Sequence, residues 1–592
     1  MSKKEQESFN DDLTSGSDGV TRGDELVEIL HPIIQSLVQF FNQRNQTSCP
    51  PELLSLLQDP SQLHPLLSPS LPQTGQGVED LARTCSTLLQ HTINTASPTF
   101  LDKLWSASSP PGIGADLLLS AINGNAHVLR VSPALTTIEK HLSKQLACLF
   151  GLNGPYSGGV TMPGGAGANL TALLTARNAR FPSIRSSGLT TKTPSNMTQL
   201  KIFTSEAAHY SIANAAQIIG LGSTTGVHRI PTTRMGQMDL DALEAALAAA
   251  ATTKVIPLCI IATAGTTVRG AYDPLKQIGQ LARRYNAWFH IDACWGGAAV
   301  FSESLREKYL AGCELADSIS FNPHKMLGVP QICSFLLAAD LRWLWGANRQ
   351  EEAAYLFHGG DNTSDTSSNT SSSLMLSGRP AVKEGGKEEE EKKGWRHESS
   401  PLLRNAPDPS EIYDLAAFTP QCGRRPDALK LYFHWRYYGT EGIAKHVEVA
   451  FQSARYLGRL VKGTGKFRLV GSILDDGGDD GISCAQVCFY YRHPSSSSSS
   501  SSSAAAALRE SIEDHTTRNT HFTRRLSAGL LARGWMVDYA PGTGRFGDHG
   551  EFLRVVCNRS TTREVVEKLV KVLMEVVRGM EEEERRGVRS RL

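Results

Sequence analysis

Two short segments of the sequence place a carboxylate and an amine where both can act on one ligand. Asp292 ends the apolar run in HIDACWGG, and Lys325 follows the apolar run in ADSISFNPHKMLG. The stretch between them is long enough for a crossover between neighbouring parallel strands. We therefore expect both side chains at the carboxyl edge of one sheet, where α/β proteins bind their ligands.

Enzymes that use pyridoxal phosphate require such a pair. The lysine amine joins the cofactor aldehyde as a Schiff base, and the carboxylate keeps the ring nitrogen protonated, so that the ring accepts electrons from the substrate. Either residue alone is more often a surface charge, so the prediction depends on finding both in this context. We predict that Lys325 binds the cofactor and that Asp292 faces its ring nitrogen.

The surrounding sequence predicts an α/β domain that positions this pair. From about residue 100 to 345, apolar runs of strand length alternate with amphipathic helical segments. Because the runs are continuous, helices should cover the strands on both faces, as in a mostly parallel sheet. The runs are KIFTS at 201, VIPLCIIATAG at 255, AWFHIDA at 287, SISF at 318 and ICSFLLA at 332.

Composition and pattern divide the rest of the chain. Two low-complexity stretches bury too little apolar area to offset the entropy lost on ordering, and we expect them to be disordered insertions. Four further apolar runs near the C-terminus predict a smaller α/β domain. The predicted parts are a disordered tail (1–24), a helical arm (25–96), a large domain (97–359), an insertion (360–410), and the end of the large domain with the small domain (411–592), which contains a poly-Ser insertion (494–507).

The bulk composition argues against several classes of partner. The chain has 592 residues, with 60 basic and 59 acidic side chains, so it has no overall field for nucleic acid or an anionic membrane. No window has the roughly 18 apolar residues of a membrane span, and the acidic N-terminus does not resemble a signal or transit peptide. The eleven cysteines are scattered, which favours reduced thiols in a cytoplasmic protein without a metal site.

These segments resemble the group II pyridoxal-phosphate-dependent decarboxylases, in particular the glutamate and cysteine-sulfinate decarboxylase branch. The likeness runs from about Leu26 to the final helix, apart from the two insertions. The segments that carry it are SPTFLDKLW at 97, TMPGGAGANLTALLTAR at 161, FTSEAAHYS at 203, ATAGTTVRGAYDP at 262, FHIDACWGG at 289, NPHKMLGV at 322, AAYLF at 353, QCGRRPDALKLYFHW at 421 and FLRVV at 552.

The resemblance implies an aspartate-aminotransferase-like fold of type I, assembled as a homodimer with active sites at the subunit interface. It also implies further contacts to pyridoxal phosphate. His209 would stack on the cofactor ring, and the backbone of a helix start would bind the phosphate, because a helix N-terminus attracts anions. The remaining implied cofactor residues are Gly165, Ala166 and Gly167 at that helix start, Thr267, Cys294 in place of a family alanine, Asn322 and His324.

The resemblance also implies residues that act on the substrate. Tyr355 resembles the mobile-loop tyrosine that returns a proton to the α-carbon. Arg554 matches the arginine that pairs with the distal acid of the substrate, and its planar fork suits a carboxylate or sulfinate. Lys103 adds a second cation, and Trp105 narrows the pocket in favour of a shorter acid. The predicted pocket is completed by Asn125 and His127.

The sequence therefore predicts decarboxylation of a small acidic L-amino acid, namely cysteine sulfinate, aspartate or glutamate. Three alternatives remain: a decarboxylase of an aromatic or other amino acid, an aminotransferase or lyase of the same fold, and a non-catalytic dimeric protein that has kept the fold. Arg554 and Lys103 argue against a bulky neutral substrate, because a buried cation without a partner is costly.

Overall fold

The computed structural model describes residues 21–42, 60–67, 71–189, 199–253, 255–349, 400–404, 406–471, 482, 484–493, 504–542 and 549–589. Tyr355 and most of the predicted tail and insertions lie outside the described residues. The chain forms two compact units. The smaller draws on Met1–Asp102, Arg524–Asp538 and Lys568–Leu592, and the larger on Lys103–Thr523 and Tyr539–Glu567.

A seven-stranded sheet forms the centre of the larger unit, with the order β1-β7-β6-β5-β4-β2-β3. The five strands β6, β5, β4, β2 and β3 run parallel to one another. β7 runs antiparallel to both of its neighbours, β1 and β6. This sheet confirms the predicted fold class. The strands are β1 (Gly158–Met162), β2 (Gln199–Ser205), β3 (Val227–Ile230), β4 (Val255–Thr263), β5 (Trp288–Asp292), β6 (Ser318–Phe321) and β7 (Ser334–Ala338).

Two of these strands were not predicted from the sequence. β1 begins with two glycines, which have low strand propensity. β3 has only four residues, and two of them are exposed and polar. Both strands lack the continuous apolar run that marked the others.

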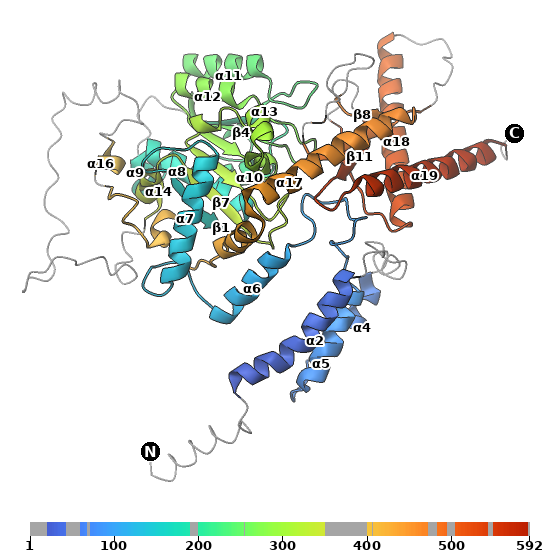
Figure 1. Cartoon of the computed structure of the whole chain (residues 1–592). Coiled ribbons are helices and arrows are strands. Elements are labelled where there is room, and N and C mark those ends of the chain that lie inside the picture. The colour runs from blue at the N-terminus through green and yellow to red at the C-terminus, as the bar shows by residue number, and fades with distance from the viewer. Residues whose placement is uncertain are drawn as a thin grey trace, which may run out of the picture. The chain divides into compact units, whose positions relative to one another are not determined.

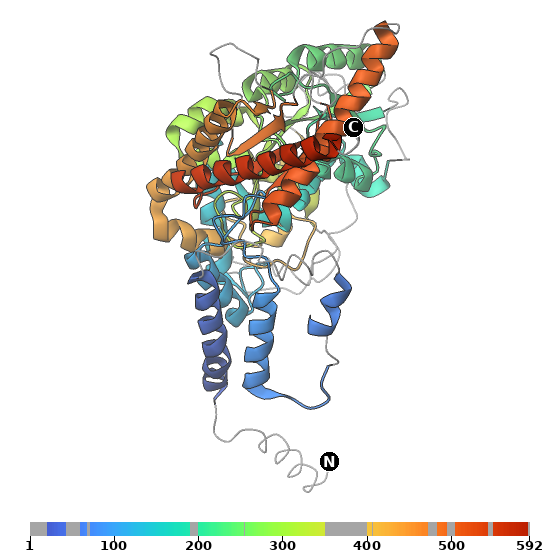
Figure 2. The ribbon, with the colours of Figure 1, turned by 90° about the vertical axis from the view of Figure 1, so that its right-hand side faces the viewer.

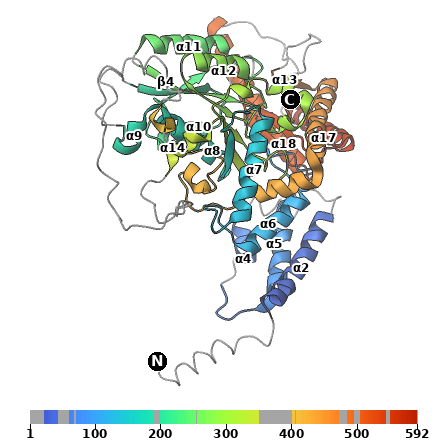
Figure 3. The same cartoon turned by 60° about the vertical axis from the view of Figure 1, so that its left-hand side comes forward.

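Helices cover both faces of this sheet (Figure 1, Figure 3). Because successive strand residues point to opposite faces, Ile260 of β4 packs in one apolar cluster while its neighbours Cys259 and Ile261 pack in another. The first face carries α7 (Pro133–Leu149), α11 (Leu240–Thr252), α12 (Leu275–Arg284), α13 (Glu303–Tyr309) and α17 (Ala428–Gly463), and the second carries α8 (Gly164–Arg180), α9 (Pro182–Ser187), α10 (Ser211–Ile218) and α14 (Leu341–Asn348).

A second sheet has the order β10-β11-β9-β8 and contains the predicted C-terminal strands. It contacts the loop that follows β4, where Gln486 Nε2 donates to Val268 O at 2.7 Å and Cys488 Sγ lies 3.3 Å from the same oxygen. The strands are β8 (Phe467–Leu469), β9 (Gln486–Tyr491), β10 (Asp538–Pro541) and β11 (Glu551–Val556). The larger unit also contains α6 (Pro110–Ile122) and α16 (Pro401–Arg404).

The smaller unit contains the helices of the predicted N-terminal arm. α2 (Arg22–Asn42) and α5 (Gly77–Gln90) lie side by side (Figure 2), and α4 (His64–Leu67) comes between them in the sequence. Two long helices, α18 (Ala504–Leu531) and α19 (Arg563–Arg589), each continue from one unit into the other. Within the described residues, none of the helices combines the length and the apolar character needed to cross a membrane.

A buried ion pair joins α7 to the segment before α17, and both of its members bond Thr161 of β1. The side chains of Arg424 and Glu139 are 4% and 0% exposed, and the guanidinium bonds to the carboxylate. Arg424 also donates to Thr161 O and to Ala126 O at 3.0 and 2.9 Å, and Thr161 N donates to Glu139 Oε1 at 2.8 Å. Removing one partner would leave the other as an uncompensated buried charge.

We expect Arg424→Met to destabilise the protein by about 3–5 kcal/mol, because Glu139 would stay buried without its cation. The midpoint of thermal unfolding measures the effect. The matched control is Arg425→Met, at a side chain that is 46% exposed, where the change should stay below about 1 kcal/mol. Equal effects of the two substitutions would contradict a special role for the buried pair.

Candidate active site

The predicted pair meets at one edge of the large sheet. Asp292 is the last residue of β5, and Lys325 follows the end of the adjacent strand β6, where Asp292 is in register with Ser320. Asp292 is buried and Lys325 is partly buried. Burial raises the pKa of Asp292, but the Lys325 ammonium and hydrogen bonds from Cys294 and Asn169 outweigh it, and the pKa lies below its usual value. The site therefore holds a buried, ionised carboxylate beside an amine.

Asn169 of α8 orients this carboxylate. Its Nδ2 atom donates to Asp292 Oδ2 and to Ser211 Oγ, each at 3.0 Å. Its Oδ1 atom accepts from Ser320 Oγ at 2.6 Å and lies 3.0 Å from His290 Nε2. One buried amide thus connects α8, α10, β5 and β6 at the edge where Asp292 emerges.

The sequence analysis missed Asn169 and the buried polar residues around it. A signal was present, since Asn169 is a polar residue in the apolar helical run ANLTALL, and buried polar groups need partners. His290 was another such signal, because it lies two residues before Asp292 in an apolar strand and so shares its face. Burial lowers the pKa of His290 to about 4, so the imidazole is neutral.

His209 lies between β2 and α10, close enough to Asp292 and Lys325 to interact with both charges. Burial lowers its pKa, Lys325 lowers it further, and Asp292 acts in the opposite direction. The Nδ1 atom of His209 lies 2.9 Å from Ser211 Oγ, which also bonds Asn169. The hydrogen bond to Ser211 thus ties the imidazole to the network around Asp292.

The start of α8 forms a place for an anion. The first N–H groups of a helix have no acceptors within the helix, and the helix dipole favours negative charge there. A Cβ atom at Gly165 would lie 2.6 Å from Cys294 Sγ and 2.7 Å from Asn322 Nδ2. A larger residue would therefore displace one of these side chains, and glycine keeps the first turn of the helix close to them.

Asn322 and His324 belong to the loop after β6, and Asn322 lies against this helix start. The Oδ1 atom of Asn322 is buried and has no hydrogen-bond partner among the residues that the structure describes. His324 Nδ1 lies 2.7 Å from Cys333 O. Burial lowers the pKa of His324 to about 4, against the effect of this hydrogen bond.

Arg554 reaches the same edge from the second sheet. It lies on β11 and is 7% exposed, and its Nη1 atom donates to Thr267 O at 3.0 Å. Thr267 belongs to the loop after β4. The guanidinium of the predicted acid-binding arginine is thus held against the loop that contains a predicted cofactor residue.

The other predicted substrate residues have weaker structural support. Lys103 is exposed and Trp105 is partly buried. The segment after them contacts the loop beyond Lys325, since Ser109 N donates to Gly328 O at 2.7 Å. The remaining predicted residues are Asn125, which accepts from Arg424 N at 2.9 Å, His127, which is partly buried, Ala166, which is exposed, and Gly167, which lies in the first turn of α8.

Comparison with known proteins identifies the family of the chain. The pyridoxal-dependent decarboxylase conserved domain matches residues 60–382 and 402–492. The chain belongs to the pyridoxal-dependent decarboxylase family. A glutamate decarboxylase-like protein of Gibberella zeae is 43% identical to it over 561 residues, which cover 94% of this chain and 98% of that protein.

Two further relatives of this decarboxylase carry more specific names. An L-aspartate decarboxylase of Metarhizium robertsii is 35% identical, covering 84% of this chain and 83% of that protein. The cysteine sulfinic acid decarboxylase of Mus musculus is 30% identical, covering 70% and 72%. The crystal structure of mouse CSAD has the same fold, with a TM-score of 0.72 at 24% identity over 93% of this chain and 98% of that chain.

The decarboxylase uses pyridoxal phosphate, and its described residues fit that cofactor. The glycine at 165 lets the first turn of α8 pack against Cys294 and Asn322, and the free N–H groups of such a helix start suit a phosphate. Asp292 is ionised at the edge where the amine of Lys325 lies, as a protonated ring nitrogen and an aldehyde require. These two observations support the sequence-based expectation of which chain segments meet the cofactor.

We expect Asn169→Ala to weaken pyridoxal phosphate binding by about tenfold, because Asp292 loses a charge-assisted hydrogen bond and its pKa rises. Titration of the apoenzyme with cofactor measures the dissociation constant. The matched control is Asn178→Ala on the same helix, where the buried amide donates to Ala347 O instead. A dissociation constant that is the same in both variants would show that Asn169 acts only on stability.

Proposed function

We propose that this enzyme decarboxylates a small acidic L-amino acid, either cysteine sulfinate, aspartate or glutamate, to the corresponding amine and carbon dioxide. The observation that carries the proposal is the buried guanidinium of Arg554, held at the edge of the sheet that bears Asp292 and Lys325. An arginine in this position offers a planar pair of donors to a second acidic group on the substrate. The relatives named above as decarboxylases of acidic amino acids support the same substrate class.

The residues divide the work according to their charge and position. Lys325 would hold the cofactor covalently, the ionised Asp292 would keep its ring nitrogen protonated, and His209 would pack its ring on the cofactor. The start of α8 would bind the phosphate, with Asn322 and His324 as further contacts. When bound, pyridoxal phosphate accepts the electron pair left when the bond between the α-carbon and the carboxylate breaks.

The reaction then needs a proton at the α-carbon. Carbon dioxide leaves without the bonding electron pair, so a proton must be added at that carbon to complete the amine. We assign this step to Tyr355, which follows α14 in the sequence and lies outside the described residues. A phenol is a suitable general acid when it can close over the substrate.

Lys103 and Trp105 would determine the size of the acidic substrate that the pocket accepts. An indole at position 105 favours cysteine sulfinate or aspartate over glutamate, because it reduces the length of the pocket. The segment after Trp105 contacts the loop beyond Lys325, which brings this part of the chain toward the site. A decarboxylase of aromatic amino acids is the second candidate, and Arg554 disfavours it because a large neutral side chain cannot neutralise the guanidinium.

We also propose that the enzyme is a cytoplasmic homodimer with both subunits contributing to each site. The exposed face of α6 carries Leu117, Leu118 and Ile122, which are 45%, 41% and 52% exposed. A second copy of the chain would remove these apolar side chains from water. The ten described cysteines are all free thiols, which is in keeping with a reducing compartment.

Lys325→Ala is expected to abolish turnover and leave the fold intact, because the cofactor loses the amine that would bind its aldehyde. Carbon dioxide release and circular dichroism measure the two properties. Lys308→Ala, on the exposed side of α13, is the matched control and should keep full activity. Substantial turnover by the Lys325 variant would rule out the assignment.

Arg554→Gln is expected to lower kcat/KM for acidic substrates by about 10- to 100-fold, because a charge-assisted pair contributes about 1.5–3 kcal/mol. Glutamate, aspartate and cysteine sulfinate are supplied together, and mass spectrometry identifies which amine forms. Tryptophan and alanine serve as neutral substrates, and Arg468→Gln on the same sheet is the control. If acidic and neutral substrates lose rate equally, Arg554 does not recognise the distal acid.

A further inference from the structure

Lys430 of α17 is a fully buried cation outside the site described above. Its side chain is 0% exposed, and its Nζ atom lies 2.8 Å from Asp427 Oδ1 and 3.8 Å from Asp116 Oδ1. The same atom donates to the main-chain oxygen of Ile332 at 2.7 Å. Two carboxylates compensate the ammonium, and its remaining bond goes to the loop between Lys325 and β7.

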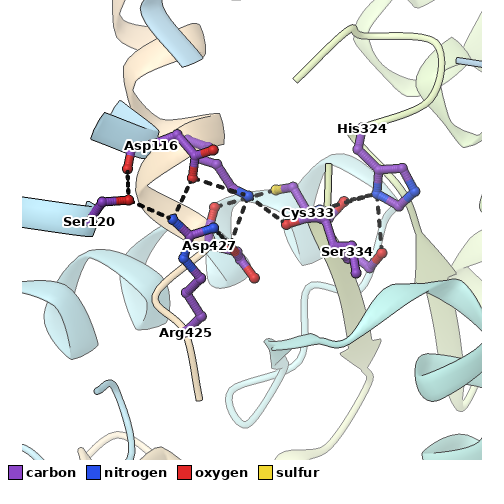
Figure 4. Close-up of polar contacts among 9 residues, drawn as sticks. Asp116, Ser120, His324, Cys333, Ser334, Arg425 and Asp427 are labelled. Atoms are coloured by element: carbon purple, nitrogen blue, oxygen red, sulfur yellow. Dashed lines mark hydrogen bonds and ion pairs between the residues drawn. The ribbon is translucent and has the colours of Figure 1, made fainter. Parts of the chain in front are cut away.

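Arg425 shares both carboxylates with Lys430 but differs from it in burial. Arg425 Nη2 lies 2.8 Å from Asp116 Oδ1 and Nη1 lies 3.9 Å from Asp427 Oδ1, and the side chain is 46% exposed. Figure 4 shows the guanidinium beside Asp116, Asp427 and Ser120, on the side away from His324. The two cations therefore belong to one charge cluster, and within the described contacts Lys430 is the one that bonds the loop.

The loop bonded by Lys430 continues directly to the partner of His324. Cys333 follows Ile332, and its main-chain oxygen lies 2.7 Å from His324 Nδ1 (Figure 4). The Sγ atom of Cys333 also lies 3.5 Å from Asp427 O. His324 precedes Lys325 in the chain, so the orientation of its ring depends on where this loop holds the Cys333 carbonyl.

Two helices hold this loop at nearby residues, Pro330 and Ile332. On the α6 side, Pro330 fits against Gly112, where a Cβ atom would lie 2.3 Å from the proline ring. On the α17 side, Lys430 supplies the bond to Ile332 O. A buried ion pair is weak evidence for stability by itself, because the loss of hydration offsets the attraction. Lys430 bonds the residue next to Cys333, the partner of His324, so this ion pair is better explained by a role in orienting His324 than by a role in stability.

We propose that Lys430 is a positioning residue for His324, and that it acts through the carbonyls of Ile332 and Cys333 to hold the imidazole in place beside the cofactor phosphate. This inference rests on the proposed role of His324 at the phosphate. Arg425 has no such role, although it pairs with the same carboxylates. Cofactor affinity, rather than substrate choice, is the property that Lys430 controls.

The test is a double-mutant cycle on the dissociation constant of pyridoxal phosphate, measured by titrating the full-length apoenzyme. Lys430→Met should raise the constant by about tenfold or more, because the loop loses a charge-assisted hydrogen bond. In the His324→Ala background the same substitution should change it by less than about twofold, because residues that act through one another are not additive. Arg425→Met should leave it unchanged.

A second variant keeps the test decisive if Lys430→Met does not fold. Lys430→Met combined with Asp427→Asn removes the uncompensated buried carboxylate but still lacks the donor to Ile332 O, so it should show the same loss of affinity. Equal losses with and without His324, or wild-type affinity in the neutral pair, would overturn the inference. Failure of the wild-type enzyme to bind the cofactor would instead refute the proposed function, which separates the two outcomes.

Discussion

The structure depends on keeping one carboxylate ionised in a buried position. Burial alone would raise the pKa of Asp292, and a neutral acid could not hold a proton on a cofactor ring. The Lys325 ammonium and the hydrogen bonds from Asn169 and the Cys294 backbone oppose burial and keep the pKa low. This balance requires that β5, β6 and α8 end or begin at the same edge of the sheet, which the parallel arrangement of the strands ensures.

Groups that attract anions lie at the same edge of the sheet as the Asp292 carboxylate. Main-chain N–H groups at the start of α8 attract an anion, and glycine at 165 lets Cys294 and Asn322 approach them. Arg554 arrives from the second sheet and is held by Thr267 O. Under the proposed function, separate elements would bind the cofactor ring, the phosphate and the distal acid of the substrate.

Buried charged side chains elsewhere in the larger unit bond the backbone of segments that lead to the same edge. Arg424 and Glu139 fix Thr161 just before the helix start, and Lys430 fixes the loop after Lys325. Each of these cations bonds main-chain oxygens as well as carboxylates. Such bonds are directional, so they restrict the backbone in a way that apolar packing does not.

The sequence by itself determined the pair Asp292 and Lys325, the mostly parallel sheet and the second sheet, because continuous apolar runs and strand-end residues are local patterns. It did not predict β1, which begins with glycines, or β3, which has exposed polar residues. It also did not predict the role of Asn169, because the partners of this side chain lie on three other elements. The sequence also did not predict the roles of Lys430 and Arg424, since their hydrogen-bond partners lie far away in the chain. Only the tertiary structure decided these, because burial and hydrogen-bond partners arise when the elements pack together.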